Sequence, residues 1–209
     1  MYCGDNPIMY VDSNGCFAII FSALLYGILI GAGIGASIGF ISAAYSDYKD
    51  EGILFNGDLS NYIGSILGGA ISGAGIGLAS TLGAGLGMAL ISGEALIVLG
   101  ASLSGSTALS IAAVGLFVSG MAGYAARTGI SNTEEFQLSH MFIEGTTNMA
   151  SGLVSFVGGV CGGILQLKIP GTKVNLKNFL LFQLGSAYFG VLPMKGLISL
   201  IKQQLEKRY

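Results

Sequence analysis

The chain has 209 residues, of which 52% are hydrophobic and only 10% are charged, and its net charge is −2. Ordinary soluble domains carry roughly 25% charged residues, so this chain lacks the polar side chains that would cover a water-facing surface. Its mean hydropathy is +0.73, and several apolar runs approach the roughly 20 residues that cross a bilayer core. Composition therefore predicts a membrane protein, and the slightly negative charge argues against a nucleic-acid partner.

The three cysteines do not form a recognisable site. Cys3, Cys16 and Cys161 lie far apart and have no CxxC spacing, so the sequence indicates neither a zinc site nor a disulfide framework. The first twelve residues carry Asp5 and Asp12 but no basic residue, which does not fit a secretory signal peptide. We expect no metal or other cofactor.

The first fifteen residues predict a short strand between two turns. Asp5-Asn6-Pro7 and Ser13-Asn14-Gly15 are turn signals on either side of an apolar piece. The string from Tyr2 to Gly15 closely resembles the motif that closes the core of RHS-repeat proteins, Tyr-x-Gly-Asn-Asn-Pro-(Val/Ile)-x-x-x-Asp-Pro-x-Gly. Asp5 stands where that motif has its first Asn, and Ser13 stands where it has Pro.

The resemblance carries several implications for the rest of the chain. Residues 1–15 would be a remnant of the RHS core end, with an RHS cage upstream in the full-length protein. The region after Gly15 would be the variable C-terminal part of a bacterial polymorphic toxin, a secreted effector with an immunity protein as its partner. Ser13 departs from the family pattern directly after Asp12, the position at which some members cleave themselves.

Two membrane-type regions follow along the chain. Residues 16–45 are mostly apolar and contain no charged residue, which predicts a transmembrane helix. Residues 46–62 are polar and rich in turn residues, and we expect this loop to lie in water. Residues 63–126 carry a single charge, Glu94, and are too long for one span, so they predict a glycine-rich helical hairpin.

The hairpin is expected to break at Ser92-Gly93-Glu94, with arms Ile63–Ile91 and Ala95–Ala126 and a kink at Gly100–Thr107 in the second arm. An ionisable group in lipid is costly. Glu94 is therefore interpreted as part of a turn at the water surface, with a pore-lining or proton-sensing role as the alternative.

Three segments complete the chain. Residues 127–148 are polar and predict an interfacial helix, residues 149–167 predict a further membrane helix, and residues 168–209 combine a basic loop, a short apolar segment and an amphipathic tail. The predicted fold class is all-α: a helical membrane protein with glycine-zipper helices, about four membrane-embedded segments and amphipathic helices.

Glycines recur at every fourth position in two of the apolar runs. Such spacing leaves one helix face without side chains, so that a second backbone can approach closely. The predicted helix-packing residues are Gly27, Gly31, Gly35, Gly39, Gly69, Gly73 and Gly77. Two interpretations remain open: packing of a stable bundle, or packing that also supports homo-oligomers and pore formation.

No catalytic constellation is visible. His140 and Glu144 would share a helix face and could form half of a metal or acid–base site, but no second ligand motif, Ser-His-Asp pattern or P-loop accompanies them. A surface helix is the preferred interpretation. An enzyme toxin built on residues 127–147 and the tail would have too little chain to bury a core, so we expect no enzyme.

The expected function is a membrane-inserting C-terminal region of an RHS-type polymorphic toxin. Glycine-zipper association would permeabilise a target-cell membrane or aid toxin delivery across it, and the lipid bilayer would be the main partner. The alternative is a non-toxic integral membrane or anchor module.

Overall fold

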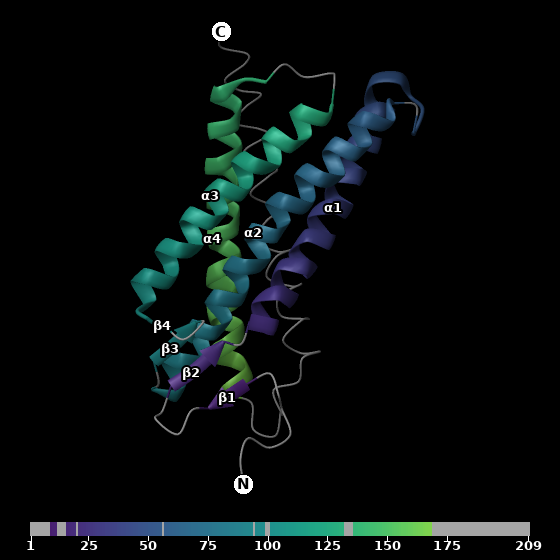
Figure 1. The fold of residues 1–209 in the computed structure, drawn as a ribbon. Coiled ribbons are helices and arrows are strands. Elements are labelled where there is room, and N and C mark those ends of the chain that lie inside the picture. Colours follow the sequence, from purple (N-terminus) through teal and green to yellow (C-terminus); the bar gives the residue numbers. More distant parts are fainter. Residues whose placement is uncertain are drawn as a thin grey trace.

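The computed structural model describes residues 9–11, 16–19, 21–55, 57–93, 95–98, 101–131 and 136–168. These residues form four long helices and four short strands (Figure 1). The helices are α1 (Phe21–Glu51), α2 (Leu59–Ser92), α3 (Gly105–Ile130) and α4 (Leu138–Lys168). The strands are β1 (Met9–Val11), β2 (Cys16–Ile19), β3 (Ala95–Val98) and β4 (Ala101–Leu103).

The predicted all-α class is confirmed. Each of the four described helices contains a stretch that is long and apolar enough to cross a membrane, with mean hydropathy between 1.2 and 2.0. These stretches are Ala23–Lys49, Leu59–Ser92, Gly105–Ile130 and Leu138–Ile164.

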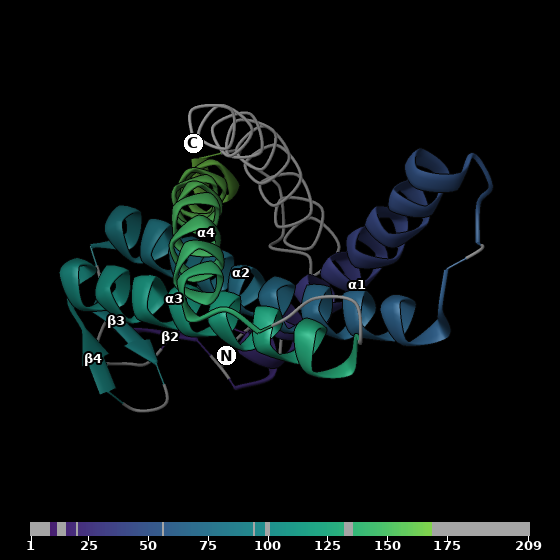
Figure 2. The same cartoon turned by 90° about the horizontal axis from the view of Figure 1, so that it is seen from above.

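Helix α2 lies at the centre of the bundle. Successive helices run in opposite directions, and α1, α3 and α4 all pack against α2 (Figures 1 and 2). Seen from above, α1 lies toward one side of α2 and α4 toward another (Figure 2). The apolar span of α2 is 72% buried and that of α1 only 17%, so α2 is the shared partner and α1 is peripheral.

A small sheet closes one end of the bundle. Its order is β1-β2-β3-β4, with β2 and β3 parallel and the two outer pairs antiparallel. Because β2 precedes α1 and β3 follows α2, the β2–β3 pairing joins the start of α1 to the end of α2. Strand β1 falls in the piece that the sequence predicts to be strand-like.

The break after α2 lies at the expected place, but the chain beyond it differs from the expectation. Gly93 has φ 73°, a left-handed conformation that ends the helix, and its N–H donates to the carbonyl of Ala89. The second arm of the hairpin is expected to begin at Ala95, yet residues 95–98 and 101–103 are strands and α3 begins at Gly105. A short apolar run cannot be assigned by periodicity, and Ser104, whose hydroxyl accepts from the N–H of Thr107 at 3.2 Å, starts the helix later.

Helix α4 merges two segments that the sequence separated. The second half of the expected interfacial segment 127–148 is joined to the expected membrane helix 149–167, because α4 runs without a break from Leu138 to Lys168, while residues 127–130 belong to α3. Two of its hydroxyl groups bond within the helix: those of Thr147 and Ser151 donate to the carbonyls of Ile143 and Thr147. The polar loop 46–62 is likewise shortened to residues 52–58, because α1 continues to Glu51 and α2 begins at Leu59.

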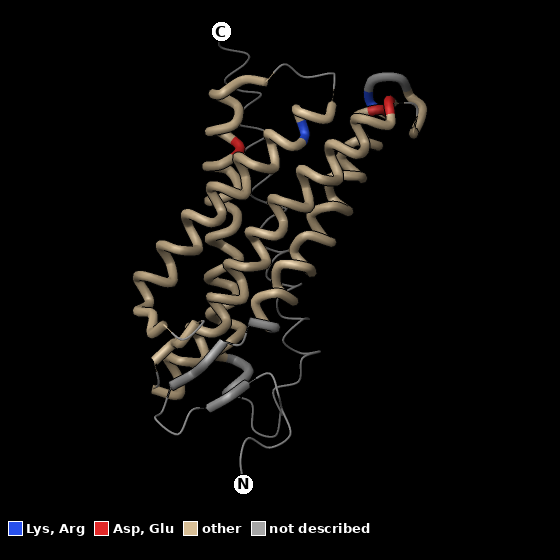
Figure 3. The backbone as a smooth tube through the Cα atoms, viewed as in Figure 1, with Lys and Arg blue, Asp and Glu red and all other residues tan. Residues whose placement is uncertain are grey.

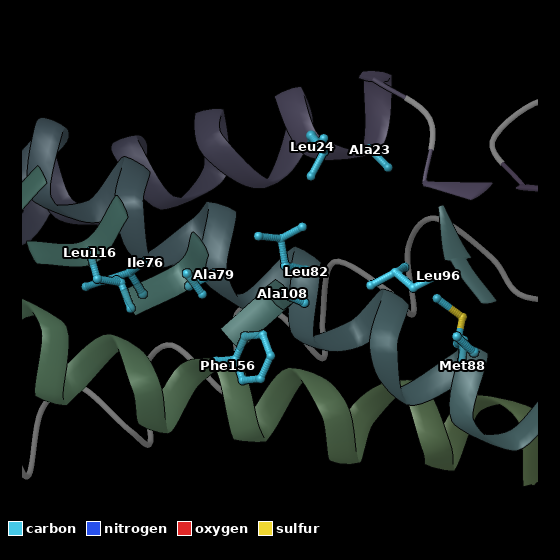
Figure 4. Close-up of a cluster of buried hydrophobic side chains, with 12 residues drawn as sticks. Ala23, Leu24, Ile76, Ala79, Leu82, Met88, Leu96, Ala108, Leu116 and Phe156 are labelled. Carbon is cyan, nitrogen blue, oxygen red and sulfur yellow. The ribbon is translucent and has the colours of Figure 1, made fainter. Parts of the chain in front are cut away.

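The interior of the bundle is built largely from small residues. Ser151, Ser155 and Ala79 are all fully buried, whereas Ile41 and Val114 are each 64% exposed. Larger core side chains, including Leu82, Leu116 and Phe156, form one cluster drawn from all four helices and β3 (Figure 4). Small residues inside and large apolar residues outside reverse the usual distribution of a soluble protein.

Charged side chains gather at one end of the bundle. Those that the structure describes are Asp47, Lys49, Asp58, Arg127 and Glu144. They lie toward the end opposite the sheet, where α1 joins α2 and α3 joins α4 (Figure 3). Between this end and the sheet, the helices carry no charged residue until Lys168, where α4 ends.

Candidate functional site: glycine interfaces and a polar cleft around α2

The glycines of α1 lie directly against those of α2. A Cβ added to Gly31 would overlap the carbonyl oxygen of Gly73 and lie 2.9 Å from the Cα of Gly77. A Cβ added to Gly35 would overlap the carbonyl oxygen of Gly69 and lie 3.0 Å from the Cα of Gly73. The two backbones therefore touch with no side chain between them, which is the approach that only glycine permits.

The two predicted glycine rows thus meet each other within one chain. At the ends of the contact, a Cβ on Gly77 would overlap the carbonyl oxygen of Gly27, and one on Gly39 would overlap that of Ser65. Gly33, also in α1, has nothing within 4 Å of an added Cβ and faces away. The contact is therefore confined to one face of α1.

Two further faces of α2 use glycine in the same way. Toward α3, a Cβ on Gly68 would lie 2.6 Å from the carbonyl oxygen of Gly123. Toward α4, a Cβ on Gly83 would overlap the carbonyl oxygen of Phe156, and one on Gly87 would overlap that of Val160. Each neighbouring helix therefore packs on its own set of α2 glycines.

The glycines of α4 were not among the predicted helix-packing residues. A Cβ on Gly159 would overlap the carbonyl oxygen of Ser80, and one on Gly163 would overlap that of Ala84. Gly83 and Gly87, like Gly159 and Gly163, are four residues apart. The signal that could have found this interface is therefore the same four-residue spacing.

A buried asparagine forms polar contacts between the helices. Asn148 of α4 is 4% exposed, and its Nδ2 donates to the carbonyl of Leu116 at 2.9 Å and to the hydroxyl of Ser119 at 3.0 Å, both in α3. The same nitrogen lies 3.4 Å from the carbonyl oxygen of Ser72 in α2. One side chain thus contacts polar groups of two other helices, a feature that glycine spacing does not predict.

Replacing Asn148 by Leu should destabilise the bundle by roughly 1 kcal/mol, since two interhelical hydrogen bonds are lost at about 0.6 kcal/mol each. The measurement is the free energy of unfolding in mixed micelles with increasing SDS. Thr146→Val is the matched control, because Thr146 is exposed on the same helix and bonds only to carbonyls of its own helix. Equal loss in both variants would contradict an interhelical role for Asn148.

A polar cleft opens between the helices near their charged end. Its volume is about 160 Å³, and glycine faces of α1, α2 and α3 form much of its wall. The polar side chains that line it are Ser42, Ser65, Ser72, Tyr124, Arg127 and Glu144. The guanidinium carbon of Arg127 lies 5.8 Å from the centre of the Tyr124 ring, a cation–π distance. In a bilayer, ionisable groups on spanning helices usually face the bundle interior or water. Arg127 and Glu144 follow this rule, because both line the cleft.

The described residues that were considered for metal or acid–base chemistry do not come together in a site. His140 packs edge-on against Tyr124, with ring centres 6.4 Å apart, and the described residues contain no group of three His, Cys, Asp or Glu that could hold a metal. Cys161 is a free, exposed thiol. Some of the predicted features lie outside the described residues: Glu94, the basic loop and tail from residue 169 on, and most of the motif at residues 2–15.

No protein-family model matches the chain, and neither the curated proteins nor the solved structures contain a match.

Proposed function

We propose that this chain is a membrane-inserting region of an RHS-type polymorphic toxin, which permeabilises a target membrane or aids the delivery of a toxin across it. The observation that carries membrane insertion is the distribution of side chains: glycine, alanine and serine between the helices, and large apolar residues outside. Lipid favours this arrangement, because helices in a bilayer associate through close packing and not through the hydrophobic effect.

The toxin assignment rests on two further features. The first is the resemblance of residues 2–15 to the closing motif of RHS cores. The second is the polar cleft, because hydroxyl, guanidinium and carboxylate groups inside a bundle of apolar helices give water and ions a place to enter. An immunity protein would be the natural partner of such a toxin, and the target-cell membrane its site of action.

The purified chain should insert into liposomes as helices and release an entrapped dye. Insertion follows because each of the four helices satisfies its own backbone hydrogen bonds in lipid. Co-flotation with vesicles, circular dichroism and dye release measure the three parts of this expectation. A chain that stays soluble without detergent would refute insertion, and a chain that floats but releases no dye at any protein-to-lipid ratio would refute permeabilisation.

A non-toxic integral membrane or anchor module is the second candidate. One observation favours it: the glycines of α1 and α2 are occupied by each other within one chain, so in this arrangement they are not available to a second copy. Expression in bacteria separates the two functions. A toxin should stop growth and be neutralised by a partner protein, whereas an anchor should do neither.

A further inference from the structure

The connection between α1 and α2 carries large apolar side chains that face outward. Ile53, Leu54, Phe55 and Leu59 are between 53% and 74% exposed. These four residues, which we call the hairpin tip, lie in the segment that the sequence analysis expected to be a loop in water. In both views of the ribbon the α1–α2 connection lies away from α3 and α4 (Figures 1 and 2), so those helices do not cover it.

The tip is held in a defined conformation. Phe55 has φ 65°, a left-handed conformation that is unfavourable for a bulky residue. Its ring stacks on Phe40 with centres 5.8 Å apart and lies 6.3 Å from Tyr62. The carboxylate of Asp47 accepts a hydrogen bond from the N–H of Gly57 at 2.9 Å and another from the hydroxyl of Tyr62. These contacts fix the connection to both helices and hold Phe55 in its exposed position despite its unfavourable backbone conformation.

The residues around the tip suit the boundary between lipid and water. Tyr45 and Tyr48, near the end of α1, are 66% and 55% exposed, and tyrosines concentrate at that boundary, where the ring meets lipid and the hydroxyl meets water. In the sequence, the charged residue Lys49 stands four positions before Ile53, and Asp58 directly precedes Leu59. At 1.5 Å per residue α1 is about 46 Å long, so it extends past a hydrocarbon core of about 30 Å.

We propose that the hairpin tip inserts into the headgroup–acyl boundary of the bilayer and anchors the α1–α2 hairpin there. Its partner is a lipid surface. The exposed apolar side chains of α1 continue into the tip, and tyrosines and charged residues flank them. This inference rests on the proposed membrane insertion. It replaces the expectation of an aqueous loop for the described part of residues 46–62.

The test uses the absence of tryptophan from the chain. Phe55→Trp introduces a single reporter at the tip, and Leu29→Trp introduces one on α1 where the native side chain is 58% exposed. Both variants are reconstituted in phosphatidylcholine vesicles whose acyl chains carry bromine either near the headgroup or near the bilayer centre. The tip reporter should emit at blue-shifted wavelengths and be quenched more by the shallow bromine. The Leu29→Trp reporter should be quenched more by the deep one.

The two proposals fail differently in this experiment. Quenching of Leu29→Trp but not of Phe55→Trp would overturn the anchor and leave membrane insertion standing, while no quenching of either reporter would overturn both. Blue-shifted tip emission that neither bromine quenches would place the tip against protein and overturn the lipid partner. Leu54→Trp is a second reporter that leaves the Phe55 stacking intact, and it should give the same shallow quenching.

Discussion

Replacing Gly31 and Gly35 by leucine should separate α1 from α2 while leaving the chain inserted and helical. Added side chains at these positions meet backbone and not flexible side chains: the carbonyl carbon of Gly69 would lie 2.8 Å from a Cβ on Gly35. Neither backbone can shift locally without breaking its own helix, so the two helices must move apart as whole units. Helicity and insertion should persist, because leucine increases hydrophobicity and each helix satisfies its own backbone in lipid.

The separation can be measured as a distance between spin labels. Labels at Ile41 of α1 and Leu67 of α2, both exposed, would be attached in a background whose three cysteines are replaced by serine. The label distance should increase by several ångströms, since helices packed through side chains have axes about 8–10 Å apart. Dye release should fall toward that of protein-free vesicles, because permeabilisation by the proposed mechanism requires glycine packing.

The control is Gly33→Leu, which makes the same change in the same helix at a position with nothing within 4 Å. It should alter neither the label distance nor dye release. Replacing glycine by alanine should change stability in opposite directions at the two kinds of position. Gly33→Ala should stabilise α1 by up to about 1 kcal/mol through helix propensity, whereas Gly35→Ala should destabilise the bundle. An unchanged distance in the Gly31 and Gly35 variant would show that α1 does not pack on α2 through these glycines.

Much of the helical architecture was predictable because its determinants are local. Lack of charge over a spanning length marks a membrane helix, and that criterion found spans in the regions of α1, α2, α3 and α4. Gly93 could be read as a break because a left-handed conformation is a property of glycine itself. Glycine at every fourth position predicts that a helix has a face for close packing, whatever helix occupies it.

The identity of each partner was not predictable, since the spacing is the same whichever helix approaches. Gly73 contacts α1 while Gly83 contacts α4, and nothing in the neighbouring sequence distinguishes them. The Asn148 contacts and the polar cleft join residues from separate helices, so they exist only after the helices assemble. The exposed apolar side chains of the hairpin tip were not predicted, because Ile53, Leu54 and Phe55 stand in a segment whose charged residues indicate a polar loop.

Helix α2 is apolar all round, as a membrane-spanning helix is. It contacts α1, α3 and α4, each through its own set of glycines. Its faces are also separable, because the glycines that meet α1 are not those that meet α4. A substitution on one face should therefore displace one neighbour and spare the others.

Replacing Gly83 and Gly87 by leucine should displace α4 from α2 and cost more stability than the change in α1. An added Cβ at Gly87 would lie 2.9 Å from the carbonyl carbon of Val160, so the leucine side chains would again meet backbone. The loss is larger because α4 packs on both α2 and α3, whereas α1 packs mainly on α2. Removing α4 from α2 also takes the Nδ2 of Asn148 away from the carbonyl oxygen of Ser72.

Spin labels at Leu90 of α2 and Val157 of α4, both exposed in the parent, would report this displacement, and SDS titration in mixed micelles would report the loss of stability. The label distance between α2 and α4 should increase, while the distance between α1 and α2 should stay at its parent value. The variant in Gly31 and Gly35 should show the reverse pattern. Gly129→Leu is the control, since that α3 glycine has nothing within 4 Å and should change neither distance. If both distances increased in both variants, α1 and α4 would not pack on α2 independently of each other. The bundle would instead assemble as one cooperative unit.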